Sequence, residues 1–246
     1  MDHAIFIAMT GATQTMRAQA ENSNNLANAN TVGFKAQVAA FQSIPILGEG
    51  YASRINAVSR GVGVNMATGP QIDTGRQLDV AVQGQGWIAV QAPDGSEAYT
   101  RAGALRLSPT GMLTTAHGRP VLGDNGPITI PAYTQLKIGA DGTISVIPTG
   151  QSPAAMASIG RIKLVNPPIT EMSQGSDGLM HMRSGNPAPA DASVQLASGV
   201  LEGSNVNPVD ALVRMIALTR QYEMQVRTIQ TENQNAQAAT RLLSLN

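Results

Sequence analysis

Residues 22–36 read NSNNLANANTVGFKA and place five asparagines ahead of a single glycine. The segment before them has the pattern of a helix with one weak apolar seam, because its positions recur at alternating steps of four and three. These positions are Ile5, Met9, Ala12, Met16, Gln19, Ser23 and Leu26. Asparagine competes with the helix backbone for hydrogen bonds, and Asn28, Asn30 and Gly33 tolerate left-handed backbone, so the helix is predicted to end in this stretch. Gly33 is interpreted either as a cap of that helix or as part of a functional motif.

The other end of the chain predicts a longer helix. Asn207 suits its capping position, Pro208 its first position and Asp210 its first turn. Steps of three and four, the spacing of a coiled-coil seam, then run without a break through Leu212, Met215, Thr219, Tyr222, Val226, Ile229, Asn233, Ala236, Thr240 and Leu243. No glycine or proline follows, so the helix is expected to be a rod about 55 Å long. Its polar seam positions call for a specific partner, whereas Gln225 and Thr228 fall outside the seam.

The middle of the chain has the pattern of an antiparallel β domain. The strand-like runs LDVAV (78–82) and GWIAVQA (86–92) precede the hairpin turn Asp94-Gly95, and further turns separate short β-prone runs up to GRIKLVN (160–166). We therefore predict an α+β fold in which the N- and C-terminal helices pair in a coiled-coil-like core domain, with a central antiparallel β domain inserted between them. The predicted parts are a helix and motif at 1–34, an extended or hairpin connector at 35–75, the β domain at 76–203 and the long helix at 204–246.

The composition excludes several classes of protein. The 246 residues include 16 basic and 16 acidic side chains, which leaves no broad basic surface for nucleic acid or an anionic membrane. The chain has no cysteine, so disulfides and thiolate zinc sites are excluded. No run approaches the roughly 18 apolar residues of a membrane span. The N-terminus lacks the basic start and apolar core of a cleavable secretory signal, and none is expected.

No pattern of catalytic, cofactor-binding or metal-binding residues stands out. His3, His117 and His181 are far apart in the sequence and are interpreted as solvated or turn residues. The run GQGWIA (84–89) lacks the third glycine and the βαβ setting of a dinucleotide fingerprint. Most aspartates lie in turns, where aspartate is favoured for local reasons. The sequence therefore predicts no enzyme, no cofactor and no small-molecule substrate.

Read together, the two ends resemble the bacterial flagellar axial proteins of the rod and hook. The N-terminal signature is carried by Asn25, Leu26, Ala27, Asn28, Thr31, Gly33, Phe34 and Lys35. The segment GSNVNPVDALVRMIALTRQYEMQVRTIQ (203–230) resembles the matching C-terminal signature, and residues 78–105 resemble the shared central domain. The likeness covers essentially the whole chain. Within the family it is strongest to the proximal rod proteins, with the distal rod proteins or another hook or rod axial protein as the alternative.

The resemblance implies a structural subunit that polymerises into the periplasmic drive shaft of the flagellar basal body and is needed for motility. It implies export through the flagellar type III apparatus, and partners that are other rod proteins and copies of itself. Besides the N-terminal signature, the implied motif or interface residues are Asn205, Leu212, Met215, Tyr222, Glu223, Val226, Ile229 and Leu243.

The asparagines have two possible roles within this picture. Asn22, Asn24, Asn25 and Asn28 are expected to bridge helices of neighbouring subunits, to cap their own helix, or both, because an amide donates and accepts at once. Two alternatives of a different class also remain open at this point, a periplasmic enzyme acting on the cell wall and a soluble β-sandwich binding module.

Overall fold

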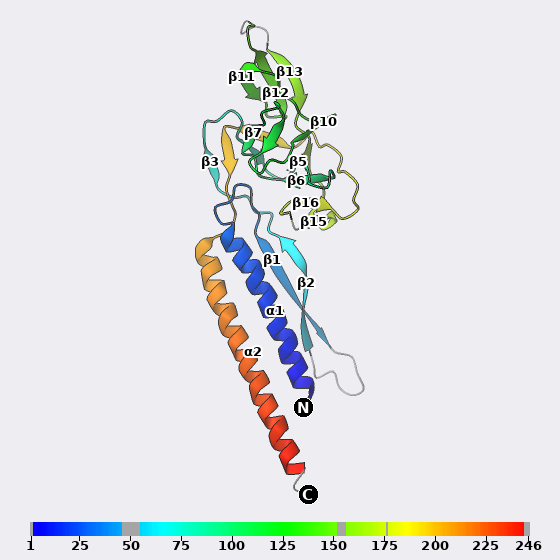
Figure 1. Ribbon diagram of the computed structural model, residues 1–246, viewed down its shortest axis with the longest axis vertical. Helices are drawn as coiled ribbons and strands as arrows, with labels where there is room; N and C mark the ends of the chain where they lie inside the picture. Colours follow the sequence, from blue (N-terminus) through cyan, green and yellow to red (C-terminus); the bar gives the residue numbers. More distant parts are fainter. Residues whose placement is uncertain (1, 46–54, 152–155, 176, 244–246) are drawn as a thin grey trace. The chain divides into compact units, whose positions relative to one another are not determined.

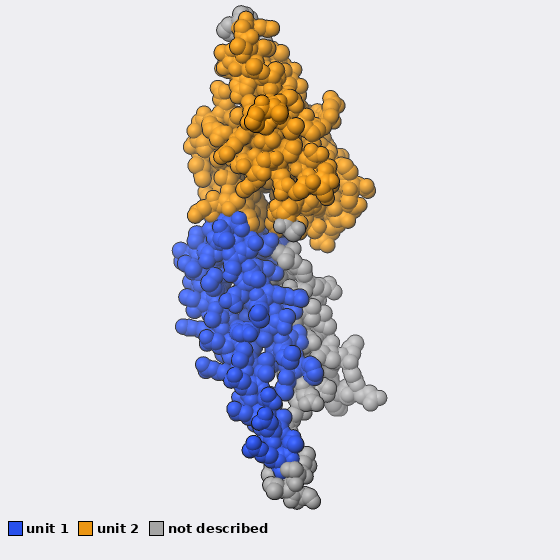
Figure 2. Space-filling view, in the orientation of Figure 1, with its two compact units in different colours: residues 1–29, 36–65, 206–246 blue, residues 30–35, 66–205 orange. Residues whose placement is uncertain are grey.

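The computed structural model describes residues 2–45, 55–151, 156–175 and 177–243. They form two compact units, which Figure 2 distinguishes by colour. Unit 1 contains residues 1–29, 36–65 and 206–246, and unit 2 contains residues 30–35 and 66–205. Each unit is thus assembled from segments that are far apart in the sequence, as expected of a domain inserted between paired ends.

Unit 1 brings the two ends of the chain together. The helices α1 (Asp2–Ala27) and α2 (Pro208–Leu243) lie side by side and antiparallel, as Figure 1 shows. α1 also packs against an antiparallel hairpin formed by β1 (Gln37–Pro45) and β2 (Ile55–Val64). The chain therefore has a mixed helix-and-strand fold, with α1 and α2 on either side of the strands in the sequence.

The start of α2 is where the sequence predicts it. Asn207 Oδ1 accepts hydrogen bonds from the backbone N–H groups of Val209 (3.0 Å) and Asp210 (3.4 Å). These are two of the donors that the first turn of a helix leaves without a backbone partner. Pro208, which has no N–H to satisfy, occupies the first helical position.

Small and polar side chains make the contact between the helices. Thr15, Ala18 and Asn22 of α1 are buried. Asn22 Nδ2 donates to the backbone oxygen of Ala211 (2.7 Å), and Thr15 Oγ1 donates to Gln225 Oε1 (3.1 Å). Because the distance between two helix axes is set by the side chains at the contact, short residues here let the backbones approach closely.

The predicted seams coincide only in part with the buried faces. Met9 and Met16 of α1 are 50% and 55% exposed, because the shorter side chains of the neighbouring face take the contact. On α2, half-buried side chains are Met215, Tyr222, Val226, Ile229 and Ala236, whereas Leu212, Thr219, Asn233 and Thr240 are exposed. Gln225 was predicted to lie outside the seam, and this is wrong: it is half-buried against Thr15 and Gly11.

Unit 2 is built from antiparallel strands. Its largest sheet has the order β14 (Leu164–Val165), β5 (Trp87–Gln91), β6 (Glu97–Thr100), β16 (Met180–Met182) and β15 (Met172–Gln174). A second sheet contains β11 (Tyr133–Ile138), β12 (Thr143–Pro148) and β13 (Ala157–Arg161). The remaining strands pair two by two: β3 (Gln71–Asp73) with β18 (Val200–Glu202), β4 (Val80–Gln83) with β17 (Gln195–Ser198), β7 (Leu105–Leu107) with β8 (Leu113–Thr115), and β9 (Leu122–Gly123) with β10 (Gly126–Pro127). A 3-10 turn, η1 (Ile169–Glu171), precedes β15.

The core of unit 2 is aliphatic. Its largest fully buried apolar side chains include Ile88, Leu105, Leu113, Ile144 and Ile162. The turn predicted at Asp94-Gly95 joins β5 to β6, with Gly95 at φ 85°. The run at 160–166, predicted as one strand, instead contributes to β13 and β14, which belong to different sheets.

The segment between α1 and the β domain is divided between the units. The hairpin of β1 and β2 belongs to unit 1, whereas β3 and the short segment 30–35 belong to unit 2. Residues 35–75, treated as one connector from the sequence, are therefore not a single structural part.

We expect Val226→Asp to lower the stability of unit 1 by about 1–2 kcal/mol, because a carboxylate would replace a half-buried apolar side chain of α2. The measurement is thermal unfolding of the full chain followed by circular dichroism at 222 nm. Thr228→Asp introduces the same residue at an exposed position of the same helix and should shift the midpoint far less. Equal shifts in the two variants would contradict the packing of Val226.

Candidate functional site

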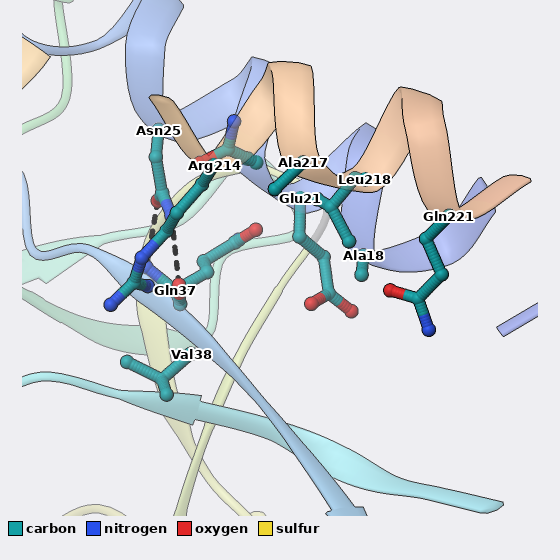
Figure 3. Close-up of a pocket in the computed structure, with 10 residues that line it drawn as sticks. Ala18, Glu21, Asn25, Gln37, Val38, Arg214, Ala217, Leu218 and Gln221 are labelled. Atoms are coloured by element: carbon teal, nitrogen blue, oxygen red, sulfur yellow. Dashed lines mark hydrogen bonds between the residues drawn. The ribbon is translucent and has the colours of Figure 1, made fainter. Parts of the chain in front are cut away.

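The asparagines at the end of α1 have partners within the chain. The Asn25 amide forms two hydrogen bonds with the backbone of Gln37: Nδ2 donates to its oxygen and Oδ1 accepts from its N–H, both at 2.8 Å (Figure 3). Asn28 Nδ2 donates to the backbone oxygen of Asn24 (2.9 Å). Leu26 is half-buried, and Ala27 is exposed as the last residue of α1. The motif thus fastens the end of α1 to the start of β1.

Gly33 is not the cap of α1, because the helix ends six residues earlier at Ala27. It nonetheless has the predicted left-handed backbone, with φ 70°. Its N–H donates to the backbone oxygen of Glu202 (2.7 Å). A Cβ at this position would lie 2.3 Å from the backbone nitrogen of Ala102 and from the carbonyl carbon of Arg101. Gly33 is therefore required both by its backbone angle and by close contact with the β domain.

Lys35 leads into a buried ion cluster. Its ammonium donates to Glu202 Oε1 (2.7 Å), and Arg101 Nη1 donates to Glu202 Oε2 (3.0 Å). The side chains of Lys35, Arg101 and Glu202 are 4%, 1% and 2% exposed. One carboxylate therefore pairs with two buried cations and can balance the charge of only one, so the cluster carries a net positive charge.

Backbone groups and an aromatic ring complete the cluster. Lys35 Nζ also donates to the backbone oxygen of Ala67 (2.7 Å), and Arg101 Nη2 donates to that of Gly84 (2.6 Å). The Arg101 guanidinium lies 5.6 Å from the centroid of the Trp87 ring, a distance at which a cation is attracted by the ring face. These contacts stabilise the charge that Glu202 leaves uncompensated.

The cluster affects the acidity of its members. Burial alone would raise the pKa of Glu202, but the hydrogen bonds from Lys35 and from the Gly69 N–H, together with the charge of Arg101, outweigh it and hold the pKa below its usual value. Burial lowers the pKa of Lys35, and the adjacent carboxylate only partly offsets this. Glu202 is thus the member whose ionised form the site favours.

Around the cluster, three segments of chain are fastened together. Asn205 donates from its backbone N–H to the oxygen of Phe34 (3.3 Å) and from Nδ2 to the oxygen of Ala67 (2.8 Å). Phe34 in turn donates its N–H to the oxygen of Thr31 (3.2 Å). The N-terminal motif, the segment near residue 67 and the segment that precedes α2 therefore meet at one place in unit 2.

The sequence alone did not single out Arg101 or Glu202. Each is a charged residue inside a short run of small or apolar residues, YTRAG (99–103) and VLEG (200–203). A lone charge in such a setting is a signal for a buried, paired group, since charged side chains are almost never fully buried unless they are paired. What could not be read from the sequence is that the two lie beside Lys35.

The helices of unit 1 leave large apolar side chains uncovered. The exposed ones are Phe6, Met9 and Met16 on α1 and Val209, Leu212, Val213, Ile216 and Met224 on α2. Glu223 is exposed as well, whereas Met215, Tyr222, Val226 and Ile229 are half-buried. Leu243 is the last residue of α2, and its side chain lies outside the described residues. Such exposed apolar surface on a monomer is typical of a protein–protein contact.

The titratable groups in turns have local roles. Asp94 accepts hydrogen bonds from the N–H and hydroxyl of Ser96, which lower the pKa of its carboxyl group. His117 is exposed, and His181 Nε2 lies 3.2 Å from the carboxylate of Asp177, four residues earlier. Within the described part of the chain, no cluster of three or more histidine, cysteine or acidic residues could hold a metal ion. Nor is any helix there both long and apolar enough to cross a bilayer.

Comparison with known proteins matches both ends and the middle of the chain. A protein-family model described as "Flagella basal body rod protein" matches residues 5–35. Another family model, described as "Flagellar basal body rod FlgEFG protein C-terminal", matches residues 197–242. A model of the "Flagellar hook protein FlgE/F/G D1 domain" matches residues 81–146. The two terminal matches contain most of the two helices that pair in unit 1, and the residues Lys35 and Glu202 that pair in unit 2.

Full-length relatives give the same result. The chain is 44% identical over 251 residues to the flagellar basal-body rod protein FlgF of Salmonella typhimurium (strain LT2), and 43% identical to that of Escherichia coli (strain K12), with all of each chain covered. The chain belongs to the flagellar basal-body rod protein family. A rod protein of a different name, FlgG of Buchnera aphidicola subsp. Acyrthosiphon pisum, is 33% identical over 97% of this chain and 99% of its own. Among rod proteins the chain is most like FlgF, as the sequence predicted, and the cell-wall enzyme and binding-module alternatives are not favoured.

We expect Gly33→Ala to destabilise unit 2 by about 3 kcal/mol or more, because the new methyl group would overlap the backbone at Arg101–Ala102 in addition to straining a positive φ. Gly75→Ala is the matched control, since Gly75 has φ 67° and open space around it, and should cost about 1 kcal/mol. Chemical unfolding followed by the fluorescence of Trp87 measures both. Equal losses would mean that the close contact at Gly33 contributes nothing.

We expect Glu202→Gln to lower the free energy of unfolding at pH 7 by about 3–5 kcal/mol, because it leaves two buried cations without a counter-charge. Glu171→Gln, at an exposed position, should be near neutral. The difference between Glu202→Gln and the parent chain should be fully present above the ordinary glutamate value of 4.5. It should then shrink as pH falls through the lowered pKa of Glu202, because protonation removes the same charge. A constant difference across that acid range would show that the cluster does not depend on the carboxylate charge.

Proposed function

We propose that this chain is a structural subunit of the proximal rod of the bacterial flagellum, which polymerises into the periplasmic drive shaft required for motility. The observation that carries the proposal is the pairing of the two chain ends in unit 1, with large apolar side chains left exposed on both helices. Membership of the rod protein family supports the same function. A structural role, with no catalytic site, is what this arrangement suits.

The assembly surface consists of the two terminal helices. Paired in a coiled-coil-like manner within each subunit, they keep a second, apolar face for neighbouring rod subunits. Leu212 is exposed, whereas Val226 and Ile229 are half-buried. Asn25 and Asn28 act first within the chain, by shaping the turn after α1, and only secondarily toward neighbours. Export through the flagellar type III apparatus delivers the chain to its place of assembly.

A deletion strain tests this function. Cells that lack the gene should build no hooks or filaments and should not swim, and a plasmid copy should restore both. Isolated basal bodies from the restored strain should contain the protein. Cells that lack the gene yet assemble normal hooks would overturn the proposal.

Ile216→Asp separates assembly from folding. Ile216 is 56% exposed, so the variant should unfold within about 1 kcal/mol of the parent chain. Swimming should be lost, because the carboxylate would be buried without a partner when subunits pack, a cost of several kcal/mol that recurs in every copy. Ile216→Leu keeps the site apolar and should swim. Normal swimming of Ile216→Asp would place the assembly surface elsewhere.

A further inference from the structure

A pocket in unit 1 contains a carboxylate oxygen to which no described residue donates a hydrogen bond. It has a volume of about 220 Å³ and lies between α1, α2 and β1, with walls that include Ala18, Val38, Ala217 and Leu218. The carboxylate of Glu21 points into it from α1 (Figure 3). Its Oε2 atom is buried and accepts no hydrogen bond, and no described residue forms a salt bridge with it. An acceptor of this kind is costly unless a donor reaches it.

Glu21 lies near two arginines of its own subunit but forms an ion pair with neither. Burial raises the pKa of the Glu21 carboxyl, and the charge of Arg17 on the same helix only partly offsets this. Arg214 also lines the pocket but makes no ion pair with Glu21. A volume of about 220 Å³ is below the roughly 300 Å³ at which small-molecule pockets begin, and it suits one long side chain. Apolar walls that end in a carboxylate match an arginine, which has an aliphatic stem and a cationic head.

α2 offers such a side chain on a different face. Val209, Val213, Ile216, Arg220 and Met224 recur at steps of three and four and are all exposed, so they form one face of the helix. Arg220 stands in the middle of this apolar face. Among the described residues it contacts no acidic group. The pocket is lined instead by Ala217, Leu218 and Gln221, so the face and the pocket lie on different sides of the same helix.

We propose that the apolar face of α2 in one subunit packs over this pocket in a second copy of the same chain, with Arg220 of the first copy paired to Glu21 of the second. A contact between two different surfaces of identical subunits is heterologous, and such contacts propagate into open helical polymers when the rotation does not close. The inference rests on the proposed function and specifies one lateral contact of the assembled rod.

Charge reversal tests the pair. Glu21→Arg and Arg220→Glu should each reduce swimming and the yield of rod-associated protein by about tenfold or more, because each buries two like charges together. Combining both changes in one chain should restore most of the loss. The control is Glu21→Arg combined with Arg227→Glu. It should not restore swimming, because Arg227 lies near the end of the same face and not at its middle. Normal levels of each variant in whole cells would exclude misfolding as the cause.

Co-expression distinguishes a contact between copies from one within a chain. Consider a cell that makes one chain with Glu21→Arg and another with Arg220→Glu. When the two chains alternate, the new arginine in the pocket of the first meets the new glutamate on the face of the second, so swimming should return. A pair within one chain would stay mismatched in both and would not be rescued. Single variants that swim normally, or reversals rescued in neither arrangement, would overturn the inference. Because the deletion strain tests the rod function separately, failure here leaves that function standing.

Discussion

The carboxylate of Glu202 is the interaction on which the architecture of unit 2 depends. It accepts hydrogen bonds from Lys35, Arg101 and the Gly69 N–H, and so joins three parts of the chain that no local structure would bring together. The pairing of β18 with β3 and the close seat of Gly33 lie in the same region. A buried cluster with one acid and two bases is a poor source of net stability, because desolvation offsets most of the attraction. What the cluster contributes is a link between segments: Lys35, Arg101 and the Gly69 N–H all reach the one carboxylate, which places these segments next to one another in the β domain.

Unit 1 is held together in a different way, by small side chains and not, among its described residues, by buried charges. Its helices meet through short side chains such as Ala18 and Thr15, so their contact uses little of the apolar surface that the sequence provides. The larger residues, among them Met16 and Ile216, are left on outer faces. A globular protein would bury these side chains first. A subunit that must bind its neighbours keeps these side chains available, and the contact between its own two helices therefore buries less apolar surface.

Much of this organisation could be predicted from the sequence, for reasons that differ from element to element. The start of α2 follows from Asn207 and Pro208, whose effects are local, and the positive φ of Gly33 from the lack of a Cβ. Periodicity did not identify the buried face of α1, because the predicted seam followed the larger side chains Met9 and Met16, whereas Thr15, Ala18 and Asn22, which recur at the same steps, are the buried ones. The partnership of Lys35 with Glu202 was also out of reach, because it joins residues 167 positions apart and depends on the whole β domain.

That separation has a kinetic consequence. Lys35 and Gly33 find their partners only when residues near 202 are present, and α1 finds its partner only after residue 208. Contacts between distant positions require the closure of long loops, whose entropy must be lost before the contacts contribute anything, so folds rich in them form slowly. A chain that emerges N-terminus first therefore cannot complete these contacts until almost all of it has appeared. The same topology that ties the two ends together leaves α1 and residues 33–35 without these partners until the last part of the chain has been made.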